Sequence, residues 1–314
     1  WIVGDLLNVS GKRWAALRSP AGNWMSLGAL GSYGSEVHAC SRSGEVVVGF
    51  SPDSGHDRGF WWTAATGMKP IVGGKGSCAY CVSDDGKFAV GYVVKGDGSV
   101  HAFRLPIGGV FQDLGTLLSD SSSSARGVSG DGSVVVGQSA SSSNQIRAFR
   151  WSQADGMKSL GSLGGTYSIA RAVSADGSVV VGQSEDATGR RVAFRWTAAT
   201  GMQSLPGAIG ETSEALDVSD DGRVVVGNYT LPDGIARGFR WTAERGMREI
   251  GTLGGESSWC YGVSGDGRIA VGVAVSPTTL FNAYRWYRAG DFDDNGFVNG
   301  DDYDLFAEHF DMGC

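Results

Sequence analysis

The chain repeats one pattern of apolar and polar positions about every 45 residues. Its clearest phrase is Ala-Val-Ser-x-Asp-Gly-x-Val-Val-Val-Gly, in which the turn glycine recurs as Gly44, Gly86, Gly132, Gly177, Gly222 and Gly267. An Asp-Gly pair tolerates positive φ and favours a tight turn between two strands. A short apolar run bounded by turns is typical of a strand buried on both faces. Each phrase therefore predicts two strands joined by a hairpin turn.

Two further phrases complete each repeat. The alternating phrase Ala-Phe-Arg-Trp predicts a third strand, with its aromatic residue at Phe60, Phe103, Phe149, Phe194, Phe239 and Tyr284. The phrase Gly-Met-x-x-Leu, clearest at 156–165 and 246–255, predicts a fourth. Four strands in about 45 residues are typical of a β-propeller blade. We predict an all-β fold over residues 1–288, a propeller of six to seven four-stranded blades; a β-solenoid is the alternative.

The composition agrees with many short strands joined by tight turns. Glycine accounts for 51 of the 314 residues and proline for only 7. The net charge of −7 belongs to the tail, because residues 289–314 contain many carboxylates and no lysine or arginine. The nearly neutral remainder has no clustered basic face for a nucleic acid. No apolar stretch is long enough to span a membrane.

The repeated phrases resemble the HAF family of extracellular repeats, whose name-giving triplet stands here as His101-Ala102-Phe103. The resemblance covers roughly residues 1–288 and rests on the Asp-Gly and Ala-Phe-Arg-Trp phrases. It implies a bacterial protein that is secreted or held at the cell surface, and it implies no particular reaction. The chain starts at Trp1 in the middle of a repeat, so we expect a fragment or mature form whose signal peptide lies outside this sequence.

An aspartate and an arginine recur together in five repeats, before the turn glycine and after the aromatic residue respectively. The pairs are Asp85 with Arg104, Asp131 with Arg150, Asp176 with Arg195, Asp221 with Arg240, and Asp266 with Arg285. One repeat has Ser43 and Trp61 instead, so both partners are missing together. A buried arginine left unpaired costs about 3–5 kcal/mol. We predict one structural Asp–Arg ion pair per blade; chance variation of two exposed side chains is the alternative.

Other positions differ between repeats, which leaves them free for recognition. On the first strand of each repeat, variable residues alternate with small ones, so one face is constant and the other varies. If this strand lines the central channel, the variable face carries candidate ligand-binding residues, which are His38, Tyr80, Arg126, Arg171, Glu214, Trp259 and Tyr261. Such aromatic, basic and acidic groups suit a glycan or a peptide. Ordinary variation against channel water is the alternative.

The acidic tail contains a loop with the spacing of a calcium site. Between Asp291 and Asp302, oxygen-bearing residues recur at alternate positions, and Gly296 stands where such a loop turns sharply. The predicted ligands are Asp291, Asp293, Asn295, Phe297 through its carbonyl, Asn299 and Asp302. A short helix with one apolar face is expected after the loop. A solvated aspartate-rich turn is the alternative.

Residues 289–314 look like one loop–helix repeat of a type I dockerin, because the loop closes with Asp302 and Val298-Asn299 precedes this end. The resemblance implies that the six residues above bind Ca²⁺. A full dockerin has two such repeats and docks onto a cohesin, whereas this tail matches one repeat, half of a module. The resemblance implies attachment to a cohesin-like or cell-envelope partner.

Familiar catalytic motifs are missing from the sequence. It has four histidines and no Gly-x-Ser-x-Gly elbow, phosphate-binding glycine loop or His-x-x-x-His pair. We therefore predict a non-enzymatic, secreted or cell-surface propeller that binds or displays, with a calcium-stabilised attachment tail. The alternative is a polysaccharide-acting enzyme, a hydrolase or lyase, or its accessory subunit, with channel carboxylates such as Glu36 and Glu214 as a pair.

Overall fold

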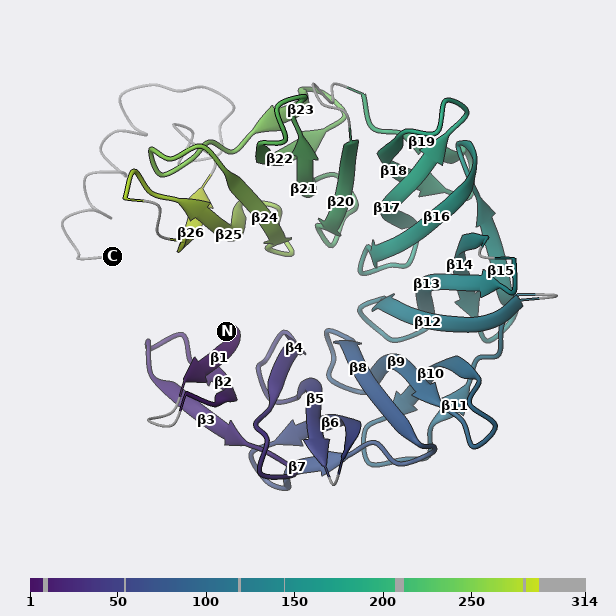
Figure 1. The fold of residues 1–314 in the computed structure, drawn as a ribbon, viewed down its shortest axis with the longest axis vertical. Coiled ribbons are helices and arrows are strands. Elements are labelled where there is room, and N and C mark those ends of the chain that lie inside the picture. The colour runs from purple at the N-terminus through teal and green to yellow at the C-terminus, as the bar shows by residue number, and fades with distance from the viewer. Residues whose placement is uncertain are drawn as a thin grey trace.

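The fold is all-β. The computed structural model describes residues 1–7, 11–53, 55–117, 120–143, 145–206, 212–278 and 281–287. These residues form 26 strands and no helix; in this part of the chain, accordingly, no helix is long and apolar enough to cross a membrane. The strands group into blades around a common centre (Figure 1). The predicted β-propeller is confirmed.

The described strands make seven blades, which we number in chain order, and blades 2 to 6 have four strands each. Blade 2 consists of β4 (Glu36–Cys40), β5 (Val47–Asp53), β6 (His56–Thr63) and β7 (Gly67–Pro70). Blade 3 consists of β8 (Gly76–Val82), β9 (Phe88–Val94), β10 (Val100–Pro106) and β11 (Gln112–Asp113). Blade 4 consists of β12 (Asp120–Val128), β13 (Val134–Ser141), β14 (Ile146–Ser152) and β15 (Gly156–Gly161). Blade 5 consists of β16 (Gly164–Val173), β17 (Val179–Asp186), β18 (Arg191–Thr197) and β19 (Gly201–Ser204). Blade 6 consists of β20 (Thr212–Val218), β21 (Val225–Thr230), β22 (Ala236–Thr242) and β23 (Gly246–Glu249).

The two terminal blades have three described strands each. Blade 1 consists of β1 (Ile2–Leu7), β2 (Arg13–Arg18) and β3 (Trp24–Gly28). Blade 7 consists of β24 (Ser258–Val263), β25 (Ile269–Val275) and β26 (Phe281–Tyr287). In blades 2 to 7, the first strand lies nearest the centre of the ring (Figure 1). The predicted role of this strand as the inner wall is therefore correct.

A hydrogen-bonded turn joins the first two strands of blades 2 to 7. In blade 4, the Gly132 N–H donates to the Ser129 carbonyl, and the φ of Gly132 is +74°, a conformation that glycine adopts without strain. Asp131 Oδ1 accepts hydrogen bonds from the Ser133 N–H and the Ser129 hydroxyl. These donors lower the pKa of Asp131 below its usual value. The aspartate of the repeat therefore closes its own turn.

Neighbouring blades share an apolar core and a buried serine. Between blades 4 and 5, Val136 and Phe194 belong to one cluster and are both fully buried. The hydroxyl of Ser168 in blade 5 accepts a hydrogen bond from the Ala148 N–H of blade 4 and donates one to the Gly161 carbonyl. The N–H to hydroxyl contact recurs at every described junction, through Ser35, Ser77, Ser123, Ser168, Ser213 and Ser258.

The recurrent arginine contacts the next blade. Arg104 Nε donates to the Gly132 carbonyl at 2.7 Å, and its guanidinium carbon lies 3.6 Å from the Phe88 ring centroid. Three others contact the next turn in the same way: Arg150 with Gly177, Arg195 with Gly222 and Arg240 with Gly267. For blades 3 to 5, the structure does not bring the Asp and Arg of one repeat together as predicted, because the arginine reaches across the junction while the aspartate closes its own turn. In blade 7, Asp266 likewise accepts from Ser264 and Arg268 in its own turn.

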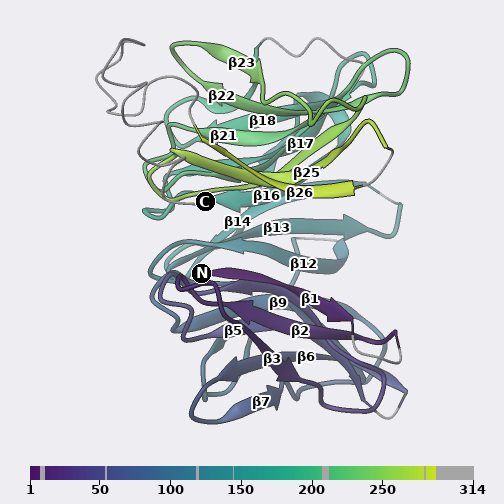
Figure 2. The same ribbon diagram turned by 90° about the vertical axis from the view of Figure 1, so that its left-hand side faces the viewer.

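Blades 1 and 7 are separated by an open seam (Figures 1 and 2). No described strand of blade 1 pairs with one of blade 7. Val271 of β25 is 40% exposed, whereas the equivalent Val136 and Val181 are fully buried. On the other side of the seam, Ile2 of β1 is 46% exposed, whereas the equivalent Val135 is fully buried. Each terminal blade therefore leaves uncovered the face that the other blades bury.

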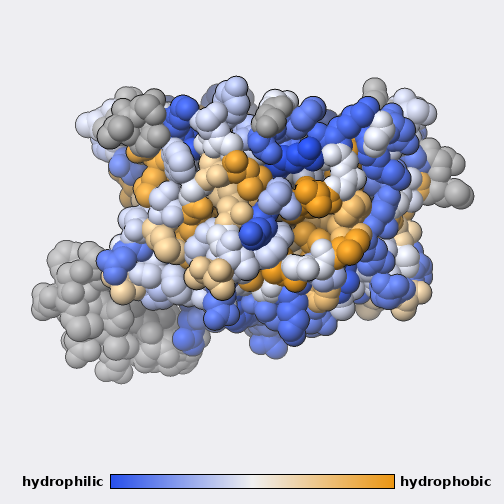
Figure 3. Space-filling model, turned by 90° about the horizontal axis from the view of Figure 1, so that it is seen from below, coloured by the Kyte–Doolittle hydropathy of each residue, from blue (hydrophilic) through white to orange (hydrophobic). Residues whose placement is uncertain are grey.

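The outer edge of the ring is also partly apolar. Figure 3 looks at this edge and shows hydrophobic side chains gathered in the middle, with hydrophilic ones toward both ends. Exposed apolar residues near the outer strands include Trp24 and Met25 in β3 and Val72 after β7.

Candidate functional site

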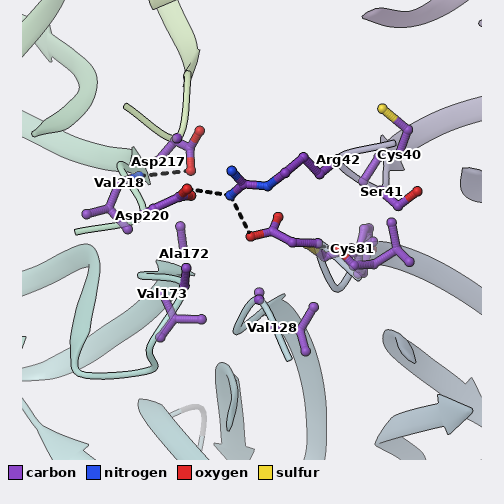
Figure 4. A pocket seen from close by; sticks show the side chains of 18 of the residues that line it. Cys40, Ser41, Arg42, Cys81, Val128, Ala172, Val173, Asp217, Val218 and Asp220 are labelled. Carbon is purple, nitrogen blue, oxygen red and sulfur yellow. Dashed lines mark hydrogen bonds and ion pairs between the residues drawn. The ribbon is translucent and has the colours of Figure 1, made fainter. Parts of the chain in front are cut away.

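The inner strands enclose one cavity of 490 Å³ at the centre of the ring. Its lining comes from all seven blades, from Trp1 at the start of blade 1 to Gly265 in the turn of blade 7. Most lining residues belong to β4, β8, β12, β16 and β20 and to the turns after them (Figure 4). The cavity is therefore the central channel that the sequence predicts, narrowed by side chains.

Arg42 reaches across one end of this cavity. Its guanidinium binds Asp84 Oδ2 at 3.0 Å and also Asp220 of blade 6 (Figure 4). The hydrogen bonds that the guanidinium donates to Asp220 and Asp84 raise the pKa of Arg42. Backbone hydrogen bonds join neighbouring turns at the same end, from the Arg42 N–H to the Asp84 carbonyl and from the Asp220 N–H to the Gly265 carbonyl. This end of the channel is therefore narrow, charged and held together between blades.

Asp217 is a carboxyl in the cavity wall beside this charged end (Figure 4). Its Oδ1 accepts a hydrogen bond from the Val218 N–H at 2.8 Å, and its Oδ2 accepts one from the Val263 N–H of blade 7 at 2.9 Å. Burial, assisted by the negative charges of Asp84 and Asp220, raises the pKa of Asp217 to about 6, although both N–H groups act in the opposite sense. Asp217 therefore gains and loses its proton close to neutral pH.

Two arginines from neighbouring blades form a further part of the wall. Arg171 Nε in β16 lies 2.5 Å from Glu214 Oε1 in β20. The guanidinium carbon of Arg126 in β12 lies 4.2 Å from the centroid of the Tyr80 ring. Tyr80 in turn stacks on His38, with ring centroids 5.2 Å apart. His38 also stacks on Phe50, so these rings and the Arg126 cation support one another and hold their polar groups at the cavity wall.

The structure brings five of the seven predicted ligand-facing residues together. His38, Tyr80, Arg126 and Arg171 line the cavity, and Glu214 binds Arg171.

The other two residues predicted to face a ligand lie outside this cavity, in β24 of blade 7. Trp259 packs against Phe281, with ring centroids 5.8 Å apart, and Tyr261 is 54% exposed. Glu36, which the alternative reading pairs with Glu214, binds Arg13 of blade 1 at 3.4 Å. The two glutamates therefore each contact an arginine of their own.

The sequence-based reasoning missed the carboxylates of the cavity. Asp84 and Asp220 occupy the variable position of the phrase Val-Ser-x-Asp-Gly, where the other repeats have Arg42, Gly130, Ala175 and Gly265. Asp217 stands where the other repeats have Ala39, Cys81, Gly127, Ala172 and Gly262. Comparison of these two positions between repeats would have found all three aspartates.

The predicted calcium ligands Asp291, Asp293, Asn295, Phe297, Asn299 and Asp302 lie outside the described residues. Across the residues that are described, no group of three or more His, Cys, Asp or Glu side chains could hold a metal ion. The thiols of Cys78 and Cys81 are free. Burial raises the pKa of Cys78 to about 12 and that of Cys81 to about 11, so both remain protonated and weakly reactive.

Comparison with known proteins finds likeness in structure alone. No protein-family model and no curated sequence matches the chain. The propeller domain of the Trilobed protease from Pyrococcus furiosus matches with a TM-score of 0.59 at 11% identity, covering 90% of each chain. A prolyl endopeptidase matches with a TM-score of 0.66 at 15% identity, covering 88% of this chain and 45% of its own. An oligogalacturonate lyase in complex with manganese matches with a TM-score of 0.57 at 14% identity, covering 90% of this chain and 81% of its own.

These comparisons correct the prediction of a non-enzymatic binding scaffold. Several of the matching propellers belong to enzymes, including prolyl endopeptidase, puromycin hydrolase and oligogalacturonate lyase, and others belong to TolB. The chain spans less than half the length of the prolyl endopeptidase, at 45%, and 61% of a TolB chain from Acinetobacter baumannii. Identities this low show the fold alone, so the reaction has to be argued from the cavity.

Proposed function

We propose that the chain is a polysaccharide-acting enzyme that binds a glycan in the central channel and uses Asp217 as a general acid. The observation that carries the proposal is the position of the Asp217 carboxyl in the cavity wall, where burial raises its pKa to about 6. General acids work best when their pKa lies near the operating pH. In glycosidic bond cleavage, Asp217 would give its proton to the leaving glycosidic oxygen as the carbon–oxygen bond breaks.

The charges around Asp217 support this role. Asp84 and Asp220 both bind Arg42, whereas both Asp217 oxygens accept only backbone N–H bonds in the interactions described here. Carboxyl groups in one pocket whose environments differ in this way divide acid and base roles between them. Asp217 is the carboxyl of the three that is not ion-paired with Arg42 and whose pKa is raised, so we assign the acid role to it.

The shape of the site and one comparison also support a glycan as the substrate. A cavity of 490 Å³ lies within the usual range of ligand sites, about 300–1,000 Å³. Its wall carries the imidazole of His38, the phenol of Tyr80 and the guanidinium of Arg126, polar groups that can hydrogen-bond the hydroxyl groups of a sugar. An oligogalacturonate lyase has the same propeller fold.

The test is turnover of polysaccharides by the chain and by Asp217→Asn. Reducing ends appearing without unsaturated sugars indicate hydrolysis, and unsaturated ends indicate elimination. We expect Asp217→Asn to lose activity by about 10²-fold or more, while Asp97→Asn, a loop carboxylate that accepts from Ser99, keeps it. Failure of the chain to release products from neutral and acidic polysaccharides, or full activity of Asp217→Asn, would contradict the proposal.

We also propose that the tail at residues 289–314 binds Ca²⁺ through its Asp291–Asp302 loop and attaches the protein to a cohesin-like or cell-envelope partner outside the cell. This proposal rests on the loop spacing and on the resemblance to HAF repeats and dockerins. Calorimetric titration of calcium into the chelator-treated chain tests it, and the absence of binding heat would overturn it.

A further inference from the structure

Arg126 differs from the equivalent arginine of the next blade in having no carboxylate partner. Arg171 occupies the same position on its strand and is neutralised by Glu214 of the following blade. The residue that corresponds to Glu214 beside Arg126 is Ile169, which is apolar. Arg126 lines the cavity and makes none of the ion pairs found among the described residues. A guanidinium held in this way is available to an external anion.

Further polar groups beside Arg126 also lack partners. Arg126 Nε, Ser124 Oγ and Gln138 Oε1 are buried atoms with no hydrogen-bond partner among the described residues. Ser124 is two residues from Arg126 on β12, next to a β-bulge between Ala125 and Gly127, and pairs in register with Gln138 on β13. Buried polar atoms without partners are destabilising and rare. Three of them on two paired strands of blade 4 set the surroundings of Arg126 apart from those of Arg171.

The corresponding amides of the next two blades do have partners. Gln183 Nε2 donates to the Ser213 carbonyl at 3.1 Å, and Asn228 Oδ1 accepts from the Cys260 N–H at 2.7 Å. In those blades, the amide binds the neighbouring inner strand and is used for structure. Gln138 has the same position on its strand and an unsatisfied oxygen. Of these three amides, Gln138 alone has a buried oxygen without a hydrogen-bond partner among the described residues.

We propose that Arg126, supported by Tyr80 in the cavity wall, forms a subsite for an acidic sugar, in which the guanidinium binds the carboxylate of a uronate residue. This inference rests on the proposed function and names its substrate class. Arginine binds carboxylates through two parallel N–H bonds. Tyr80 supports the guanidinium from one side, and Ser124 and Gln138 of the same blade bring further hydrogen-bonding groups near the base of this arginine.

The experiment measures binding by calorimetry, with Asp217→Asn present in every chain so that no probe is consumed. The probes are oligogalacturonate, the same oligosaccharide with its carboxylates methyl-esterified, poly-glutamate and inorganic phosphate. We expect oligogalacturonate to bind, and Arg126→Gln or esterification to weaken binding about tenfold or more, since a charged hydrogen bond is lost. Arg126→Lys keeps the charge and should retain part of the affinity. Arg190→Gln, which removes the same charge from an outer loop where Arg190 binds Asp186, should change nothing.

Each outcome separates this inference from the proposed function. Unchanged binding in a folded Arg126→Gln chain, checked by its melting temperature, overturns the subsite. Equal, Arg126-dependent binding of poly-glutamate makes the ligand an acidic peptide, and equal binding of phosphate makes it a simple anion; both overturn the sugar assignment. Cleavage of a neutral glycan without uronate binding leaves the function standing and removes the subsite. If the chain binds uronate through Arg126 but cleaves no polysaccharide, the subsite stands and the proposed function is overturned.

Discussion

At the scale of single residues, the behaviour of Asp217 follows from its surroundings. Equivalent positions in the other blades hold Ala, Cys or Gly, so this carboxyl occupies a place that is elsewhere filled by a small side chain. Burial raises its pKa to about 6, which means that the folded protein holds this proton more tightly than the unfolded chain does. Ionisation of Asp217 therefore destabilises the fold as pH rises. Ionisation of the turn aspartates, whose pKa values are lowered, stabilises it.

We predict that Asp217 makes the protein less stable as pH rises from about 4 to about 6. Below pH 4 both states are protonated, between the two pKa values only the folded state holds the proton, and above 6 both are ionised. The loss amounts to about 1–2 kcal/mol once screening by channel water is allowed for. Denaturant unfolding of the parent chain and of Asp217→Asn across this range measures the difference. Parallel stability curves for the two proteins would contradict the raised pKa.

At the scale of elements, the sequence predicts the strands and turns well, because Asp-Gly turns and apolar runs are local signals. Strand alternation also places Tyr80 and Arg126 in the channel. It fails at Asp217, because a β-bulge between Ala215 and Asp217 breaks the two-residue period. Leu216 and Asp217 then both line the cavity, whereas strict alternation predicts that only one does. Contacts between blades, such as those of Arg104, have no local signal at all.

We predict that Arg104 is coupled in stability to the aspartate of the next blade rather than to that of its own. Arg104 donates to the Gly132 carbonyl, in the turn that Asp131 closes, whereas Asp85 accepts from Ser83 and Lys87 in its own turn. In double-mutant cycles with Arg104→Gln, Asp131→Asn should therefore show a coupling above about 0.5 kcal/mol and Asp85→Asn one below it. Denaturant unfolding provides the four free energies of each cycle. A larger coupling with Asp85 would instead restore the ion pair predicted from the sequence.

At the scale of the whole molecule, the seam is the feature that breaks the repeat. In blades 2 to 6, the valine that precedes the glycine of the second strand is buried against the following blade, as Val136 is in blade 4. The equivalent Val271 of blade 7 is 40% exposed. The sequence does not predict this difference, since Val136 and Val271 stand in nearly identical phrases. Whether this valine is buried depends on the neighbouring blade, and the sequence of a single repeat does not specify that neighbour.

We predict that the same substitution has different costs at these two positions. Val136→Thr places a hydroxyl in a fully buried site and should reduce the free energy of unfolding by about 1–3 kcal/mol. Val271→Thr places it on a face that is 40% exposed and should change stability by less than about 0.5 kcal/mol. Denaturant midpoints of the two variants give the comparison. Equal losses would mean that the face of blade 7 is covered in solution.

The seam also determines how the protein loses its structure. A closed ring has no ends, so each module is flanked on both sides, but seven modules in a row behave as a one-dimensional array with nearest-neighbour coupling. Among the described residues, blades 1 and 7 each have one blade interface and should open most readily, while the blades in the middle open last. Blade 4, which carries Arg126, stands halfway along this row. The subsite assigned to it therefore lies in the module that opens least often, far from both fraying ends.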